Sequence, residues 1–248
     1  MNSSALIPFI DLTTLQGTDN DLTAKQIVIK GLALKEKGIL PASICVFPTL
    51  VKNIVHHSSH QIRVASVAGG FPAGLTPTDI KCAETKFALE QGADEIDIVI
   101  NRGKLMEGED AFVLDEITRV KETCGNKILK VIIESGELQT EELIKKASRI
   151  ALDAGADFLK TSTGKVPIGA TPEAAQWMSE VLLEHYKKTS NKRGLKLSGG
   201  IANKTAALQY IDQVRNLLGP DWIQPDLFRI GASKLFDELV MDVTTNNN

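Results

Sequence analysis

The fold of this chain is decided by Gly155-Ala156-Asp157-Phe158-Leu159-Lys160-Thr161-Ser162-Thr163-Gly164-Lys165. Gly-Ala-Asp is typical of a helix end that runs into a strand, because glycine suits the left-handed position after a helix. Residues 158–163 predict a short buried strand with Lys160 inside it. An ammonium group on an apolar strand loses hydration, so its pKa falls and the neutral amine can attack a carbonyl group. Gly164 and Lys165 then form a polar loop suited to an anion.

Apolar runs that resemble this strand recur along the chain, and an amphipathic stretch follows each of them. The predicted strands are 6–13, 42–47, 62–68, 95–100, 128–134, 158–163, 194–198 and 227–231, and the predicted helices are 21–37, 48–58, 77–91, 109–124, 139–153, 172–188, 203–218 and 233–240. Strands that alternate with helices pair in parallel through right-handed crossovers. The pattern predicts an α/β fold, a (β/α)8 TIM barrel.

The predicted domain organisation is a single barrel over residues 1–248, with a short flexible polar tail over about 242–248. Gly92-Ala93-Asp94 before the fourth strand repeats the Gly155-Ala156-Asp157 pattern, which is a weak internal repeat one βα unit long. The alternative fold is an open doubly wound sheet, but no Gly-x-Gly-x-x-Gly follows the first strand.

Composition excludes several classes of protein. Hydrophobic residues make up 43% of the chain, and no apolar run approaches the roughly 20 residues of a membrane helix. The net charge is −3 with scattered basic residues, which gives no footprint for nucleic acid. The first residues lack a basic segment followed by an apolar one, and the three cysteines are far apart. We expect a cytoplasmic protein that binds neither membranes nor nucleic acid.

Seven ionisable or thiol side chains, which lie on six of the eight predicted strands, are selected as candidate site residues. They are Asp11, Cys45, Asp97, Lys130, Glu134, Lys160 and Lys196. The carboxyl ends of barrel strands converge on one pocket, and charges inside strands are costly unless they are paired. We therefore expect a shared polar site, with a purely structural ion-pair network as the alternative. Within it, Lys130 is predicted to form an ion pair with Glu134 or Asp97.

Two lysines on adjacent strands favour amine chemistry. Lys160 and Lys196 should approach each other closely, so one amine is driven toward its neutral form near pH 7. A neutral lysine converts an aldehyde into an imine, and Asp97 is placed to move protons as a general acid and base. The residue types therefore indicate carbon–carbon bond formation or cleavage without a metal, although an aldolase is not the only enzyme that fits them.

Glycines after the late strands favour a phosphorylated substrate. Gly164-Lys165, Gly199-Gly200 and Gly231-Ala232-Ser233 follow or end the sixth, seventh and eighth strands. Glycines let backbone N–H groups approach an anion, and late loops of such barrels often bind phosphate at a helix N-terminus. Each pair alone is more simply an ordinary turn, but three on consecutive strands favour a phosphate site.

These residues carry a resemblance to the deoxyribose-phosphate aldolase family, which covers residues from about 11 to 233. The matching segments are 11–15, 44–46, 92–97, 129–134, 158–165, Lys196 and Gly199-Gly200. The resemblance implies a (β/α)8 class I aldolase, a lyase without cofactor or metal. Such an enzyme cleaves 2-deoxy-D-ribose 5-phosphate reversibly to D-glyceraldehyde 3-phosphate and acetaldehyde, in deoxyribose phosphate catabolism.

The resemblance also implies roles for individual residues. Lys160 becomes the Schiff-base lysine, Lys196 the neighbour that lowers its pKa, and Asp97 the proton donor and acceptor. The implied phosphate-binding residues are Lys165, Gly199, Gly200, Gly231 and Ser233, and we add Gly164 and Lys234 from the same loops. The implied supporting pocket residues are Asp11, Thr13 and Cys45, and we add Lys130 and Glu134 as charged residues of the fifth strand.

Several positions differ from the family pattern. Leu197 stands where the family has a small residue or proline, and Ala202 stands where many members carry an arginine near the phosphate. Lys234 stands where some members have a second serine, and it supplies a positive charge there. The chain also has no terminal tyrosine. These differences bear on phosphate affinity and turnover, and they leave the imine chemistry intact.

Two other functions remain as alternatives: a phosphosugar isomerase and a non-catalytic phosphosugar-binding barrel that acts as a sensor. An isomerase needs a carboxylate base but no neutral lysine on a strand. We expect the barrel to pair as a homodimer through its outer helices. His56, His57 and His60 lack a nearby carboxylate or cysteine in sequence, which favours an exposed helix face over a metal site.

Overall fold

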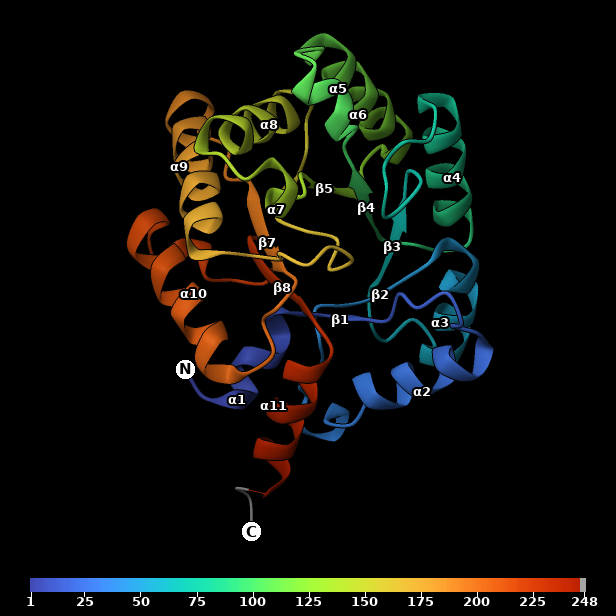
Figure 1. The fold of residues 1–248 in the computed structure, drawn as a ribbon. Coiled ribbons are helices and arrows are strands. Elements are labelled where there is room, and N and C mark those ends of the chain that lie inside the picture. Colours follow the sequence, from blue (N-terminus) through green and yellow to red (C-terminus); the bar gives the residue numbers. More distant parts are fainter. Residues whose placement is uncertain (246–248) are drawn as a thin grey trace.

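A closed barrel of parallel strands forms the centre of the structure, a computed structural model that describes residues 1–245 (Figure 1). The strands are β1 Ile10–Thr13, β2 Ser43–Val46, β3 Val64–Ala68, β4 Glu95–Val99, β5 Ile128–Ile132, β6 Phe158–Lys160, β7 Gly194–Ser198 and β8 Phe228–Ala232. Each strand pairs with the next in chain order, and β8 pairs with β1 to close the barrel. The predicted (β/α)8 barrel is confirmed.

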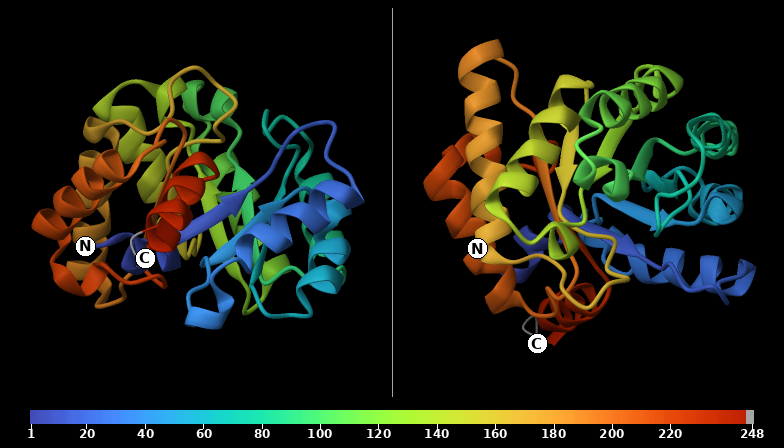
Figure 2. Two further views of the ribbon diagram at one scale, coloured as in Figure 1. Left: turned by 90° about the horizontal axis from the view of Figure 1, so that it is seen from below. Right: turned by 45° about the horizontal axis from the view of Figure 1, so that its top comes forward.

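The helices lie around the outside of the barrel (Figures 1 and 2). The longer helices are α2 Asp21–Gly31, α3 Val51–Ser58, α4 Thr78–Glu90, α6 Asp110–Cys124, α8 Glu141–Asp153, α9 Pro172–Thr189, α10 Lys204–Leu218 and α11 Lys234–Thr245. The shorter ones are α1 Ser3–Leu6, α5 Arg102–Met106, α7 Ser135–Leu138 and 3₁₀ turns at Ile7–Phe9, Lys35–Lys37, Pro48–Leu50 and Pro220–Trp222. Each strand is therefore followed by a long helix, as the sequence predicts.

The first strand is shorter than predicted. We expected a strand over 6–13, but the chain forms α1 and a 3₁₀ turn before β1 begins at Ile10. The Asn2 side chain caps α1 by accepting a hydrogen bond from the Ala5 N–H group at 3.0 Å. Leu6 and Ile7 are fully buried. An apolar run of this length is compatible with a buried strand and with a buried helix, so the sequence pattern alone does not distinguish the two.

Alternation along the strands separates the apolar core from the polar interior. On β7, Leu195 and Leu197 belong to the apolar core that the barrel shares with its helices, whereas Lys196 contacts carboxylates inside the barrel. Successive side chains of a strand point to opposite faces. Leu197 therefore packs in the core and lies away from the candidate site, so this difference from the family pattern does not alter the site directly.

Both Gly-Ala-Asp segments perform the same structural task. The Asp94 carboxylate accepts a hydrogen bond from the Val64 N–H group at 3.1 Å, and the Asp157 carboxylate accepts one from the Leu129 N–H group at 2.9 Å. Each aspartate thus satisfies a backbone donor at the start of the preceding strand. The repeat seen in the sequence marks the N-terminal end of the barrel, opposite to the polar strand ends.

The C-terminal region is more ordered than predicted. We expected a flexible tail over about 242–248, but α11 continues to Thr245 and the side chain of Thr245 donates a hydrogen bond to the Met241 carbonyl at 2.9 Å. Residues 246–248 lie outside the described part of the chain.

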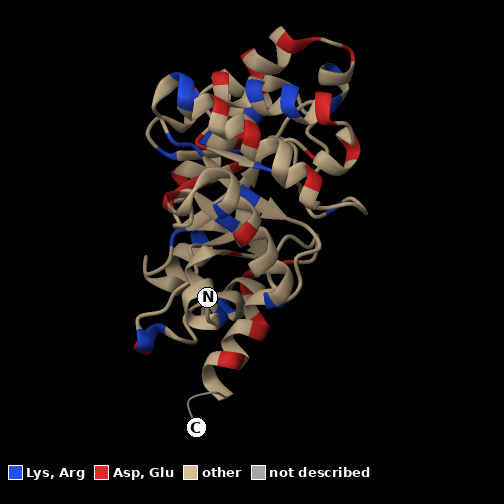
Figure 3. Cartoon of the chain, turned by 90° about the vertical axis from the view of Figure 1, so that its left-hand side faces the viewer, with Lys and Arg blue, Asp and Glu red and all other residues tan. Residues whose placement is uncertain are grey.

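Acidic and basic residues are interspersed over the helices that face the viewer in Figure 3. Across residues 1–245, no helix combines the length and apolar character needed to cross a membrane.

Candidate active site

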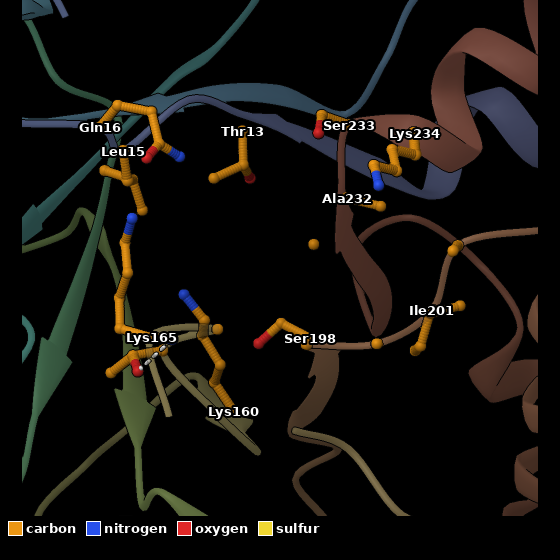
Figure 4. Close-up of a pocket in the computed structure, with 16 residues that line it drawn as sticks. Thr13, Leu15, Gln16, Lys160, Lys165, Ser198, Ile201, Ala232, Ser233 and Lys234 are labelled. Atoms are coloured by element: carbon orange, nitrogen blue, oxygen red, sulfur yellow. Dashed lines mark hydrogen bonds between the residues drawn. The ribbon is translucent and has the colours of Figure 1, made fainter. Parts of the chain in front are cut away.

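A cavity of about 410 Å³ opens at the carboxyl ends of the strands (Figure 4). Its walls come from the ends of β1, β6, β7 and β8 and the segments that follow them. The predicted site residues among its lining are Thr13, Lys160, Gly164, Lys165, Gly199, Gly200, Gly231, Ser233 and Lys234. The structure therefore brings the predicted lysine and the predicted phosphate loops to one cavity.

Lys160 lines this cavity and is 3% exposed. The sequence predicted a strand that continues to residue 163, but β6 ends at Lys160 itself. Thr161 is fully buried, and its side chain donates to the Ser198 carbonyl at 3.2 Å. The chain leaves the sheet directly after the lysine, so the amine is supported by a rigid strand and faces open space.

Buried charges lie next to Lys160 inside the barrel and form a closed ring of alternating sign, which we call the charged ring. In order, its members are Arg229, Asp11, Lys196, Asp97, Lys130 and Glu95, which returns to Arg229. The N···O distances in that order are 2.7, 2.6, 2.7, 2.8, 2.6 and 3.1 Å. Each cation therefore lies between two carboxylates, and each carboxylate between two cations.

Lys160 is attached to the ring through Asp97. Its Nζ atom lies 2.8 Å from Asp97 Oδ2, the same oxygen that receives Lys196 Nζ at 2.7 Å. The other oxygen, Asp97 Oδ1, receives Lys130 Nζ at 2.8 Å. This carboxylate thus has three cations around it. Although burial opposes ionisation, the lysines hold the pKa of Asp97 well below its usual range.

The pKa values of the two predicted catalytic lysines shift in opposite directions. Burial lowers the pKa of Lys160, and the nearby charge of Lys196 acts in the same direction, against the attraction of Asp97. Burial acts to lower the pKa of Lys196 too, but Asp11 and Asp97 together raise it above its ordinary value. Lys160 is therefore the amine that loses its proton more readily, and Lys196 the one that holds its proton more strongly.

Sequence reasoning missed two ring members, Glu95 and Arg229. Both are fully buried on strands, and Arg229 places its guanidinium group 5.6 Å from the centre of the Phe158 ring. Both lie within predicted strands, so the criterion that selected Asp11 and Lys196, an ionisable side chain inside a predicted strand, would have identified them. Lys130 pairs with Asp97 as predicted; its second partner is Glu95 and not Glu134.

Glu134 lies apart from the ring and supports the loop after β6. Its backbone has a φ of 55°, in the left-handed region that non-glycine residues rarely adopt. Its carboxylate accepts hydrogen bonds from the Thr163 N–H group at 3.1 Å and from the Thr163 hydroxyl group. The Thr163 hydroxyl oxygen in turn accepts the Lys165 N–H group at 3.0 Å. Buried Glu134 is therefore tied to the segment that carries Gly164 and Lys165.

Cys45 is a buried wall residue of the barrel interior. It is fully buried and packs with Leu15, Ala65 and Val67 in a small apolar cluster. Burial raises the pKa of the Cys45 thiol, which disfavours the thiolate form. A supporting role for Cys45 at the site stays a prediction.

Ser233 and Lys234 lie on the side of the cavity opposite to Leu15 and Gln16. Figure 4 shows the Lys234 side chain next to Ser233 and Ala232, while Lys165 extends toward Leu15. Lys234 is the first residue of α11, so its ammonium group and the helix N-terminus both favour an anion there. Ala202, the position without an arginine, also lines the cavity.

Three glycines shape the cavity wall near Ser233 and Lys234 in different ways. Gly199 and Gly200 both have a φ of 85°, which a side chain would strain. At Gly231, a Cβ atom would lie 3.0 Å from Ser198 Cβ and 3.3 Å from Lys196 Cε. Gly231 therefore leaves room for the side chain of Lys196, and the two other glycines allow the backbone to turn at the cavity wall.

The histidines predicted to lie on a helix face occur in and after α3. His57 Nε2 lies 2.8 Å from Asp21 Oδ1 on α2. Among residues 1–245, no group of three or more His, Cys, Asp or Glu side chains is arranged to hold a metal ion.

Comparison with known proteins adds an independent finding. Residues 5–215 match the model of the DeoC/LacD family aldolases. The human deoxyribose-phosphate aldolase is 40% identical over 247 residues, which cover 94% of this chain and 78% of the human protein. The bovine deoxyribose-phosphate aldolase is 39% identical over 244 residues, covering 93% of this chain and 77% of the bovine protein.

Solved structures are similar over nearly the whole barrel. A structure from Toxoplasma gondii ME49, of a protein assigned as a deoxyribose-phosphate aldolase, has a TM-score of 0.88 at 26% identity. The match covers 98% of this chain and 94% of that one. The deoxyribose phosphate aldolase of Aeropyrum pernix, at 22% identity and a TM-score of 0.76, covers 99% of this chain and 93% of its own and shares the fold.

Proposed function

The chain belongs to the DeoC/LacD family of aldolases, and from this premise we propose that it is a deoxyribose-phosphate aldolase. It cleaves 2-deoxy-D-ribose 5-phosphate reversibly to D-glyceraldehyde 3-phosphate and acetaldehyde, as an aldehyde-lyase that works through a Schiff base. The observation that carries the proposal is the Lys160 amine, which lines the cavity while its proton is disfavoured by burial and by Lys196.

The reaction starts at Lys160. Its neutral amine attacks the aldehyde carbon of the open-chain sugar, and the carbinolamine that forms takes up one proton and loses water to give a protonated imine. The imine withdraws electrons from the bond between the second and third sugar carbons. When a base removes the proton of the third-carbon hydroxyl group, that bond breaks, glyceraldehyde 3-phosphate leaves, and the remaining two carbons stay on Lys160 as an enamine. Protonation of the enamine and hydrolysis release acetaldehyde.

Asp97 and Lys196 are the proposed partners in the proton transfers. Asp97 Oδ2 lies 2.8 Å from Lys160 Nζ, within the range that proton transfer requires. Lys196 donates to the same oxygen at 2.7 Å and keeps it ionised. The carboxylate can therefore relay protons between the Lys160 nitrogen and the carbinolamine oxygen during imine formation, directly or through a water. The positive charge of Lys196 stabilises the ionised form of Asp97.

The phosphate group is proposed to bind at the side of the cavity formed by Gly199, Gly200, Ser233 and Lys234, with Lys165 across from it. Left-handed glycines expose backbone N–H groups, and the start of α11 adds its helix dipole. Lys234 provides a cation on a side where Ala202 provides none. Glu134, Thr13, Asp11, Cys45 and Lys130 take supporting positions. The homodimer expected from the sequence and its cytoplasmic location stay predictions.

The two alternative functions need no reactive amine, so trapping of an imine on a lysine distinguishes the aldolase from both of them. We expect reduction with borohydride in the presence of acetaldehyde to place an ethyl group on Lys160, located by peptide mass mapping. The other lysines of the chain serve as internal controls in the same map. An adduct elsewhere would overturn the choice of nucleophile. Folded protein with no adduct would favour the isomerase or the phosphosugar-binding barrel.

A further inference from the structure

The charged ring has a charge balance that singles out Lys160. Its carboxylates are Asp11, Glu95 and Asp97, and its cations are Lys130, Lys196 and Arg229. Every member is at most 1% exposed at its side chain. Three negative and three positive charges cancel, so the ring is neutral without Lys160.

A protonated Lys160 would give this buried cluster an excess positive charge. Uncompensated charge in a low-dielectric interior is costly, and the group that is most easily neutralised gives up its proton. Lys130, Lys196 and Arg229 each contact two carboxylates in the ring, whereas Lys160 contacts Asp97 at its edge and faces the cavity. Lys160 is therefore the member of the cluster that loses its proton.

Arg229 belongs to this balance although it does not touch the nucleophile. Its Nη1 atom lies 2.7 Å from Asp11 Oδ1, and Asp11 Oδ2 lies 2.6 Å from Lys196 Nζ. On the other side, Arg229 pairs with Glu95 at 3.1 Å, and Glu95 pairs with Lys130 at 2.6 Å. Both paths end at Asp97, the carboxylate that Lys160 contacts.

We propose that Arg229 and Glu95, which have no part in the chemical steps, set the protonation of Lys160 through the charge balance of the ring. Arg229 is a positioning residue: it offsets Asp11 and Glu95, so these carboxylates do not recruit a proton onto Lys160. Glu95 acts with the opposite sign. The proposal rests on the proposed function, because it assigns Lys160 as the amine that must be neutral.

The groups around each partner are consistent with a purely electrostatic effect. Lys160 faces Asp97 from β4, Lys196 from β7 and Cys45 from β2. Arg229 faces Asp11 and Glu95, the Phe158 ring and the Pro225 carbonyl oxygen. Glu95 faces Lys130 and Arg229 within the ring and, outside it, the half-exposed Arg63, whose Nη1 atom lies 3.8 Å from Glu95 Oε1. Arg229 is fully buried and does not line the cavity. A change in its charge therefore reaches Lys160 through the ring.

The test compares two variants that change the ring charge in opposite directions. The measurement is kcat/KM for cleavage of 2-deoxy-D-ribose 5-phosphate against pH, whose acid limb reports the free enzyme. Arg229→Met removes a positive charge, so the acid limb should move to higher pH by about one unit. Glu95→Gln removes a negative charge, so the limb should move to lower pH. Substrate ionisation is common to all the profiles and does not produce a difference between them.

Matched controls separate charge from packing. Arg229→Lys keeps the charge, so the limb should stay near the wild-type position. Lys81→Met removes another fully buried cation, one paired with Glu116 at 2.9 Å outside the ring, and should leave the limb unchanged. Acetaldehyde trapping on Lys160 is followed in every variant. If Arg229→Met does not fold, Glu95→Gln carries the test alone.

The outcomes are distinct. Opposite shifts in Arg229→Met and Glu95→Gln support the proposal, as does a downward shift in Glu95→Gln where Arg229→Met does not fold; a folded Arg229→Met with an unshifted limb overturns it. If Lys160 is trapped but neither ring variant shifts the limb, or if Lys81→Met shifts it equally, the proposal is overturned while the aldolase assignment stands. If Lys160 is not trapped in the wild-type protein, the proposed function fails first.

Discussion

Lys160 and Lys196 lie opposite each other on β6 and β7, and their amines share one carboxylate oxygen, Asp97 Oδ2, at 2.8 and 2.7 Å. The pairing looks symmetrical, but the surroundings are not. Lys196 has a second carboxylate, Asp11, at 2.6 Å, whereas Lys160 faces the cavity. The same oxygen therefore holds a permanent ammonium group on one side and a potential nucleophile on the other.

Replacing Lys196 with leucine should raise the pKa of Lys160, because a nearby positive charge that disfavours its protonation is lost. We expect kcat/KM to fall most near neutral pH and to recover in part as the pH rises. The pH–rate profile measures this directly. A profile of unchanged shape, only scaled down, would show that Lys196 acts in some other way than through its charge.

Removal of the Lys234 ammonium group should weaken phosphate binding. For Lys234→Ala we expect KM for the phosphorylated sugar to rise roughly ten-fold, since a hydrogen bond to a charged group contributes about 1.5–3 kcal/mol. The KM for unphosphorylated deoxyribose should stay the same. Lys25→Ala, an exposed lysine on α2, is the control for a general charge effect. An equal response of both substrates would remove Lys234 from the phosphate site.

Thr163→Val should loosen the loop that carries Gly164 and Lys165. The variant loses the hydroxyl group that bonds to Glu134 and accepts the Lys165 N–H group. We expect a several-fold higher KM with kcat little changed, and a loss of about 1–3 kcal/mol of unfolding free energy. Thr85→Val is a matched control, because the buried Thr85 hydroxyl has no hydrogen-bond partner within residues 1–245. Equal effects in both variants would contradict a specific role for Thr163.

The stability of the protein should fall at acid pH. Asp11 and Asp97 have pKa values held below the ordinary range by the ring cations, against the effect of burial. Carboxylates with a lowered folded-state pKa stabilise the protein above their unfolded pKa, about 3.9, and this contribution is lost as the pH falls below it. Urea unfolding at pH 7, 5, 4 and 3 measures the effect. A free energy of unfolding that stays level from pH 5 to pH 3 would show that these carboxylates are not ionised in the folded protein.

The sequence was sufficient for the barrel and for the centre of the site, because both depend on short-range patterns. Strand and helix alternation predicted the topology, and lysines inside strands predicted the polar interior. The ring was not predicted as a ring. Its order depends on how Glu95 and Arg229 meet across the barrel, and strand spacing does not encode that contact.

Local backbone geometry was the second source of error. Glu134 was one of two predicted partners of Lys130, and the other, Asp97, is confirmed. The left-handed backbone of Glu134 belongs to the turn into α7, and its carboxylate contacts Thr163. At the N-terminus, the buried Leu6 and Ile7 fit a helix as well as a strand. In both places the pattern of side chains is compatible with two backbone conformations. The structure shows which of the two forms.

The ion pair between Asp11 of β1 and Arg229 of β8 also has a consequence for folding. The two residues are 218 positions apart in sequence and meet where the barrel closes. Contacts of such long sequence separation make folding slow, and this one requires the last strand. A nascent chain that has reached β7 already contains Lys160, Lys196 and Asp97, but not Arg229. Without β8 the barrel is open and the ring is incomplete, so by the charge balance proposed above we expect Lys160 to become reactive toward aldehydes only once the barrel has closed.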